Sequence, residues 1–285
     1  QALKANTTGG ENTAVGVDAL LTNTTGAKNI AIGYDALQFN TTGDNNSIIG
    51  HQSGLYNTTG EKNTALGFIA LQDNTTGNYN VAIGADALKN NTTASYNIGI
   101  GVDALATNTT GNTHVAVGYN ALSSNTTGSQ NTGLGCSALD ANTTGASNTA
   151  VGKDSLAANT TADNNTAVGY ASLNVNTTGA SNTATGKSSL GSNTTGDNNS
   201  AFGHNALVLN TTGSYNVAFG NSALFTNTTG LQNTAVGYYA LKNSTGNGNT
   251  AIGNQALEDV TTGTGNVAVG GDAGREITTG NRNTA

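Results

Sequence analysis

A 17-residue repeat constrains the fold of this chain more than any other feature of its sequence. The clearest copy, from Asn12 to Lys28, reads N-T-A-V-G-V-D-A-L-L-T-N-T-T-G-A-K. The glycine that closes N-T-A-V-G recurs every 17 residues from Gly16 to Gly237, and the next one, Gly253, follows after 16 residues. We place the missing residue between Leu241 and Asn243. A fixed short period is typical of solenoids, whose repeats must stack to bury their apolar faces, so we expect about 17 stacked coils.

The composition favours an ordered stack over a conventional core. Charged residues make up 9% of the 285 residues and aromatic residues 5%, so large side chains cannot fill a layered core. Low complexity is also typical of disorder, but disordered segments lack the phased apolar positions that recur here. No shift in composition marks a linker. We therefore expect a single β-solenoid repeat domain over 1–285, with divergent last coils over 243–285.

Charge and cysteine content argue against several classes of partner. The net charge is −7, and the nine Lys and Arg residues form no basic stripe, so we expect neither nucleic acid nor an anionic membrane as partner. No apolar run approaches the roughly 18 residues of a spanning helix, so we expect no membrane insertion. The single cysteine, Cys136, excludes an internal disulfide, and an incidental surface thiol is its simplest interpretation.

The N-T-A-V-G segment alternates as a β-strand does. Its second and fourth positions are β-branched or bulky in nearly every copy, which suits a pleated surface. A helix is disfavoured because each of the two glycines per repeat would destabilise it by about 1 kcal/mol. We therefore predict an all-β fold, a parallel β-solenoid (β-roll) of about 17 coils.

The two faces of this strand differ in side-chain size, and we use the difference to orient it. Side chains at the second and fourth positions share one face, and the middle position lies on the other. The middle position is Ala in most copies, with Gly99 and Gly133 smaller and Ile48 the one large residue. We expect the bulky face to fill the coil's own interior. The small face, as at Ala150 and Ala167, should lie against a second and a third chain, because close backbone approach needs small residues.

Two further columns run along the predicted stack. A leucine recurs in most coils, as at Leu20, and each buried leucine contributes roughly 1.5–3 kcal/mol. Gly54 and Gly274 interrupt this column, and Leu55 could compensate for the first. Turn chemistry explains the closing N-T-T-G, and stacking should join its asparagines, from Asn6 onward, into a hydrogen-bonded ladder.

The same N-T-T tripeptide is an N-glycosylation sequon. Glycans on successive coils, with anchors only about 5 Å apart, could not all fit on one face. Either the chain is made where sequons are not read, or these asparagines are buried.

The slot two residues ahead of the leucine column is acidic in some coils. One interpretation is a calcium ladder. We favour solvated turn residues, because other residue types fill the slot elsewhere and the G-G-x-G-x-D pattern of calcium-binding β-rolls is missing. The acidic members are Asp18, Asp35, Asp86, Asp103, Asp154 and Asp272.

No residues have the spacing of a catalytic or metal site. His51 and His204 share one slot in distant coils, whereas His114 opens a strand, so the three cannot converge. Cys136 is too far along its coil from His114 to be activated by it. We see no recurring carboxylate pair and no phosphate-binding glycine motif. We therefore predict no enzymatic activity, no catalytic, cofactor-binding or metal-binding residues, and no cofactor.

The repeat resembles two kinds of fibre sequence. N-T-A-V-G-x-x-A-L, as in the segment starting at Asn148, resembles the S-V-A-I-G-x-x-S head repeats of trimeric autotransporter adhesins. The full unit from Asn216 to Gly230 is even more similar to the N-T-A-x-G-Y-x-A-L-x-x-N-T-T-G arrays of bacterial and phage tail-fibre-type proteins. The resemblance covers the whole chain. It implies left-handed coils, a homotrimer, and an extracellular location at a cell surface or on a virion fibre.

Two functions remain open at this point. The first is an extracellular structural or adhesive fibre that spaces or displays a binding surface. Its partners would be copies of itself, in a homotrimer and an end-to-end filament, and surface glycans or a host protein. The second is an ice-binding (antifreeze) solenoid that uses the two threonine columns. The variable slots that could contact a partner hold Tyr34, Tyr79, Tyr96, Tyr119, Tyr170, Tyr215, Tyr238 and Tyr239.

Overall fold

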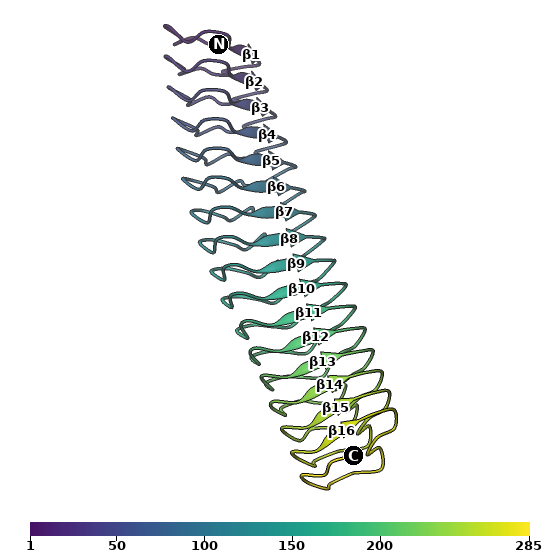
Figure 1. Cartoon of the computed structure of the whole chain (residues 1–285). Coiled ribbons are helices and arrows are strands. Elements are labelled where there is room, and N and C mark those ends of the chain that lie inside the picture. Colours follow the sequence, from purple (N-terminus) through teal and green to yellow (C-terminus); the bar gives the residue numbers. More distant parts are fainter. The chain divides into compact units, whose positions relative to one another are not determined.

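The computed structural model describes all residues, 1–285, as strands, turns and bends without any helix. The residues form two compact units, unit 1 (Gln1–Ala146) and unit 2 (Ser147–Ala285), and each is described by itself. Within each unit the strands follow one another in chain order, one strand to a coil (Figure 1). The predicted all-β parallel solenoid is therefore confirmed.

Every strand has three residues and occupies the T-A-V part of the repeat. It ends there because the next residue is a glycine such as Gly16, at φ +136°, where a Cβ would overlap the carbonyl oxygen of Gly33. The strands of unit 1 are β1 (Thr13–Val15), β2 (Ile30–Ile32), β3 (Ser47–Ile49), β4 (Thr64–Leu66), β5 (Val81–Ile83), β6 (Ile98–Ile100), β7 (Val115–Val117) and β8 (Thr132–Leu134). Those of unit 2 are β9 (Thr149–Val151), β10 (Thr166–Val168), β11 (Thr183–Thr185), β12 (Ser200–Phe202), β13 (Val217–Phe219), β14 (Thr234–Val236), β15 (Thr250–Ile252) and β16 (Val267–Val269).

Neighbouring strands in each unit pair in parallel and without offset. Ala14 of β1 pairs with Ala31 of β2, and the same register continues from coil to coil. It also survives the 16-residue coil of unit 2, where Thr234 of β14 pairs with Thr250 of β15. Equivalent residues of successive coils therefore lie side by side, and any residue type that recurs in one slot forms a row.

The structure moves the missing residue from its predicted place. The amide of Ser244 donates to the carbonyl of Leu241 at 3.1 Å, as turn asparagines do in other coils. The amide of Thr245 then pairs with the carbonyl of Thr261 at 2.7 Å, as first turn threonines do. The short coil therefore lacks its second turn threonine, not a residue between Leu241 and Asn243. The second turn threonine contacts the next coil only through its amide, as Thr25 does with the carbonyl of Thr41 at 3.2 Å, and its side chain belongs to no ladder, so the coil can do without it.

The structure also reverses the predicted orientation of the strand faces. From β2 to β16 the middle residue is buried, and both Ala31 and Ala150 are 0% exposed. The bulky last residues point outward instead, with Val15 and Phe219 each 57% exposed. The small face packs inside its own coil, so the prediction that Ala150 and Ala167 lie against other chains is wrong.

The narrow interior of the coil explains this orientation. A Cβ built on Gly99 of β6 would already lie 3.1 Å from the carbonyl oxygen of Ala104 and 3.3 Å from Cγ of Leu88. Only Ala or Gly fits opposite an intact leucine column, because interiors pack densely and adapt little. The leucines and the small residues together are the core of each unit.

Ile48 is the exception that follows from the same rule. It lies in β3 opposite Gly54, the residue that interrupts the leucine column in this coil, and a Cβ on Gly54 would lie 3.3 Å from Cγ2 of Ile48. Both Ile48 and Leu55 are buried. The space of the missing leucine is therefore filled from the strand side by Ile48, in addition to the predicted Leu55.

Most coils have three left-handed residues outside glycine. In one coil these are Asp18 at φ +54°, Leu20 at +50° and Lys28 at +59°. Asn and Asp tolerate this region best, so backbone conformation accounts for the aspartates ahead of the leucine column. A left-handed leucine costs roughly 1–2 kcal/mol, and its burial, worth roughly 1.5–3 kcal/mol, offsets that cost.

Asparagine ladders run through the interior, as predicted for the turn asparagines. Nδ2 of Asn40 donates to Oδ1 of Asn23 in the preceding coil at 2.8 Å and to the carbonyl of Gly43 at 3.0 Å. A second ladder joins the asparagines before each strand, where the amide of Asn46 donates to Oδ1 of Asn29 at 2.9 Å. The sequon asparagines Asn23 and Asn40 are fully buried, so they are inaccessible to glycosylation in the folded chain.

The turn ladder is interrupted at the short coil. Ser244 stands where other coils have asparagine, and its side chain is too short to reach the preceding coil. Oδ1 of Asn227 and Oγ of Ser244 are consequently buried without a hydrogen-bond partner. Unpaired buried polar atoms are destabilising, so this is a weak point of unit 2.

Candidate functional site

The first candidate is the outer strand face, which we define as the first and last residues of the strands. Because the strands pair without offset, these residues form two rows on the outside of each unit. Parallel sheets usually have both faces covered, whereas here only the inner face is. The exposed apolar members are Val15, Ile30, Ile32, Ile49, Leu66, Val117 and Leu134 in unit 1, and Val168, Val217, Phe219, Ile252, Val267 and Val269 in unit 2.

Aromatic rings on unit 1 stack where one slot is aromatic in consecutive coils. In the slot after the strand glycine, His51 lies between Tyr34 and Phe68, with ring centroids 5.2 and 5.3 Å away. In the slot before the next strand, Tyr79 stacks on Tyr96 at 5.0 Å. His51 is therefore part of an exposed aromatic row and is not directed toward other histidines.

A third stack stands directly before the turn asparagines. Phe39 and Tyr56 lie 5.5 Å apart with their ring planes at 4°. An open hollow of about 540 Å³ adjoins them, and its lining also includes Asp73 and the turn threonines Thr58, Thr75 and Thr92. Neither Phe39 nor Tyr56 was among the predicted contact residues. Their signal in the sequence is two aromatic residues 17 positions apart in a slot that holds no aromatic residue in other coils.

The predicted tyrosines lie on the surface, with one difference. Tyr239 is half-buried, and its ring packs 3.8 Å from that of Tyr238 and 4.1 Å from Nζ of Lys242. The others are exposed: Tyr34, Tyr79, Tyr96, Tyr119, Tyr170, Tyr215 and Tyr238. Exposure makes them available for contacts.

His114 replaces an asparagine in the ladder before the strands. Its amide donates to Oδ1 of Asn97 at 3.0 Å, and its Nδ1 accepts from the amide of Asn131 at 3.2 Å. Burial lowers the pKa of His114 to about 4, although hydrogen bonds with the backbone of Gly128 and Asn131 act to raise it. The neutral ring therefore does what an asparagine side chain does in the neighbouring coils, and because it is buried with Nδ1 hydrogen-bonded it is not available as a general base.

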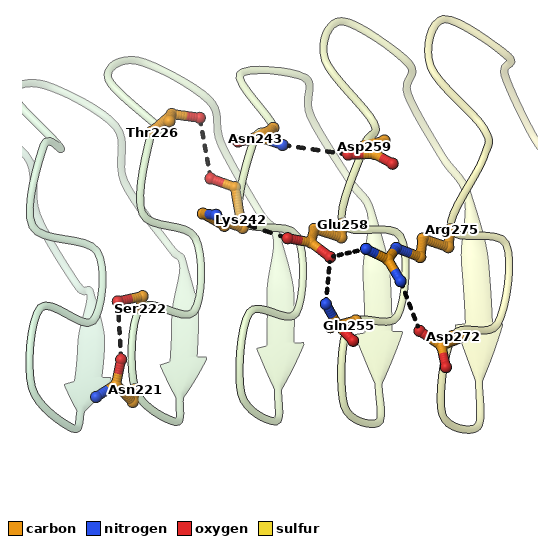
Figure 2. A network of polar contacts seen from close by, with 10 residues as sticks. All are labelled: Asn221, Ser222, Thr226, Lys242, Asn243, Gln255, Glu258, Asp259, Asp272 and Arg275. Atoms are coloured by element: carbon orange, nitrogen blue, oxygen red, sulfur yellow. Dashed lines mark hydrogen bonds and ion pairs between the residues drawn. The ribbon is translucent and has the colours of Figure 1, made fainter.

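Charged side chains gather in the last coils of unit 2, as Figure 2 shows. Glu258 is almost fully buried between Lys242 of the coil before, at 3.6 Å, and Arg275 of the coil after, at 3.3 Å. Gln255 donates to the same carboxylate at 2.8 Å, and Arg275 also pairs with Asp272 at 3.3 Å. Lys242, Glu258 and Arg275 occupy one slot of consecutive coils, so the stack itself brings alternating charges together. These ion pairs link three consecutive coils.

The remaining chemical groups stay apart. Cys136 is a free, half-buried thiol whose Sγ lies 3.9 Å from Oγ of Ser137. No group of three His, Cys, Asp or Glu side chains is placed to hold a metal ion. No helix has the length and hydropathy of a membrane span. A comparison of the chain with protein-family models and with curated proteins gave no match.

Proposed function

We propose that this protein is an extracellular structural fibre, at a cell surface or on a virion, with an adhesive role for residues displayed on its coils. The observation that supports it is the row of last strand residues on the outer strand face. These residues are apolar in every strand except β11 and are exposed or half-buried, while the interior of each coil is already filled. A continuous exposed apolar surface is typical of an interaction site. The proposal involves no catalytic group, cofactor or metal.

The partner that we propose for the outer strand face is a further copy of the chain, in a homotrimer of left-handed coils. A second copy has the same coil period, so its rows of side chains can match these rows along many coils. An unrelated partner would match only locally. The likeness of the repeat to trimeric adhesin heads and tail-fibre arrays points the same way. We also propose end-to-end association into filaments, in which the strand edge of one copy pairs with that of the next.

Replacing Leu66 and Val117 on the outer strand face with Lys tests this association. Both side chains point outward, so the double variant should fold normally, but it would place two unpaired charges in the interface. We expect the mass measured by analytical ultracentrifugation to fall from that of a trimer to that of a monomer. Thr76→Lys, at an exposed corner threonine, is the matched control and should remain trimeric.

Two results would contradict the proposal. One is a wild-type chain that sediments as a monomer at micromolar concentration. The other is a double Lys variant with unchanged mass and unchanged circular dichroism.

Ice binding is the second candidate function, and one observation favours it. The second turn threonines, such as Thr25 and Thr42, are exposed in a row on the outside of the turn. The first turn threonines are engaged, since Oγ1 of Thr24 donates to the carbonyl of Thr41 at 3.0 Å. Only one free hydroxyl column remains, so we expect no thermal hysteresis at millimolar protein. A measurable hysteresis gap that Thr25→Val and Thr42→Val change would favour this function over the fibre.

A further inference from the structure

The aromatic stack of Phe39 and Tyr56 ends abruptly at the next coil. The slot that holds these rings holds Asp73 in the following coil, and the rings are already parallel, 5.5 Å apart. Phe39 therefore covers the face of Tyr56 that is directed toward the preceding coil. The opposite face of Tyr56 is directed toward the short side chain of Asp73 in the following coil. The hollow of about 540 Å³ lies at this step. It is a place where one more flat ring would continue the stack.

The polar groups that line the hollow are hydrogen-bond acceptors. Oγ1 of Thr58 donates its proton to the carbonyl of Thr75 at 2.9 Å, and Oγ1 of Thr75 donates to the carbonyl of Thr92 at 2.9 Å. These hydroxyls therefore have only lone pairs left to offer. Asp73 adds a half-buried carboxylate. A ligand for this hollow must bring several donors and one flat apolar face.

We propose that this hollow binds a saccharide, with a pyranose ring stacked on the free face of Tyr56 and its hydroxyls donating to Asp73 and to the turn threonines. A pyranose has both required features, an apolar C–H face and hydroxyl donors around its rim. The threonines recur once per coil, at about the 4.8 Å spacing of neighbouring strands, so a linear oligosaccharide can follow them along the unit. This inference deepens the proposed function, because it gives the displayed surface of the fibre a ligand class.

A cationic ligand is the competing class, since a ring face and a carboxylate also suit an ammonium group. The surroundings of Asp73 disfavour it. Lys89 lies close enough to act on Asp73 and lowers the pKa of that carboxyl, but the larger effect is burial, which raises it. A cationic ligand at Asp73 would therefore approach the ammonium group of Lys89, which itself pairs with Asp86 at 3.3 Å. A neutral hydroxyl meets no such competition.

Saturation-transfer NMR on the full chain tests the proposal with four probes: maltohexaose, cellohexaose, chitohexaose and a hexalysine peptide. We expect at least one hexasaccharide to bind, with the strongest saturation on ring C–H protons. Tyr56→Thr should weaken its affinity by about tenfold, because one stacking face is lost. Thr is the residue that other coils carry in this slot, as at Thr22 and Thr107, so this variant should fold.

Further variants separate the site from the rest of the surface. Asp73→Ala should weaken the same saccharide by a similar factor, whereas Tyr170→Thr, an isolated exposed tyrosine on unit 2, should leave affinity unchanged. The inference is overturned if no hexasaccharide binds, if Tyr56→Thr binds as well as the wild type, or if only hexalysine binds in an Asp73-dependent way. Sedimentation of the same samples tests the trimeric fibre separately from the saccharide site. A trimer that binds no saccharide overturns only the ligand, and a monomer that binds one overturns only the fibre.

Discussion

At many positions in this protein, the contacts with the next coil decide which residue types are accepted. His114 shows this clearly, because a histidine can join an asparagine ladder only as a neutral ring with Nδ1 free to accept. Protonation would place a donor against the amide of Asn131, inside a fully buried site. This ladder position therefore accepts a histidine only while its ring is neutral.

This condition predicts a pH-dependent stability that His114→Asn removes. The folded pKa of His114, about 4, lies below the ordinary histidine value of 6.5, so on acidification the unfolded chain takes up a proton that the folded chain resists. Stability should be fully present above about pH 6.5 and fall by up to about 3 kcal/mol as the pH drops to 4. Urea unfolding at pH 7.5 and pH 4.5 measures it. All other groups are shared, so equal losses in wild type and variant would contradict the prediction.

At the scale of the coil, the strand and the leucine column share one interior. Ile48 and Gly54 show that a large residue is accepted on the strand side only where the leucine side is vacated. The core is therefore set by paired choices across the coil. The side-chain size that one position accepts depends on the size of the residue opposite it in the same coil.

This pairing makes Ile48 and Gly54 a compensating pair. Ile48→Ala alone should destabilise by roughly 2–5 kcal/mol, through a cavity. Gly54→Leu alone should destabilise by roughly 1–3 kcal/mol, through overpacking. The double variant recreates the common coil and should be more stable than either single variant. Chemical denaturation of the four proteins gives the coupling energy, and additive effects would show that the two sites do not share a space.

The period, the parallel strands and the turn ladder could be predicted from the sequence, because each follows from recurrence in one slot. Which strand face is inward could not. Alternation separates Val15 from Ala14 but does not say which of them meets the leucine column. The answer depends on the width of the coil interior, which is visible only when Leu88 is seen 3.3 Å from a Cβ on Gly99. The hollow beside Tyr56 could not be predicted either, because it depends on how the side chains of one row change from aromatic rings to the shorter Asp73.

At the scale of the whole molecule, the reversed strand faces move the expected site of association, but self-association is still expected. With the alanines inside, the outer strand face becomes the surface that a second copy would cover. Its composition differs between the units, since β8 ends in Leu134 whereas β11 ends in Thr185. The loss of trimer mass expected for Leu66→Lys with Val117→Lys is therefore a statement about unit 1.

The offset-free pairing of the strands has a genetic consequence. Within a unit, most coils present their neighbour with the same backbone donors, the same asparagine bonds and the same leucine contact. Deleting or duplicating one 17-residue repeat would join coils through contacts of the same kind as those it replaces. Unequal recombination between the matching DNA segments could therefore change the length of the protein in whole-coil steps without creating an unfavourable junction. The length of the protein would then be inherited as the number of repeats, which selection can change without changing the fold.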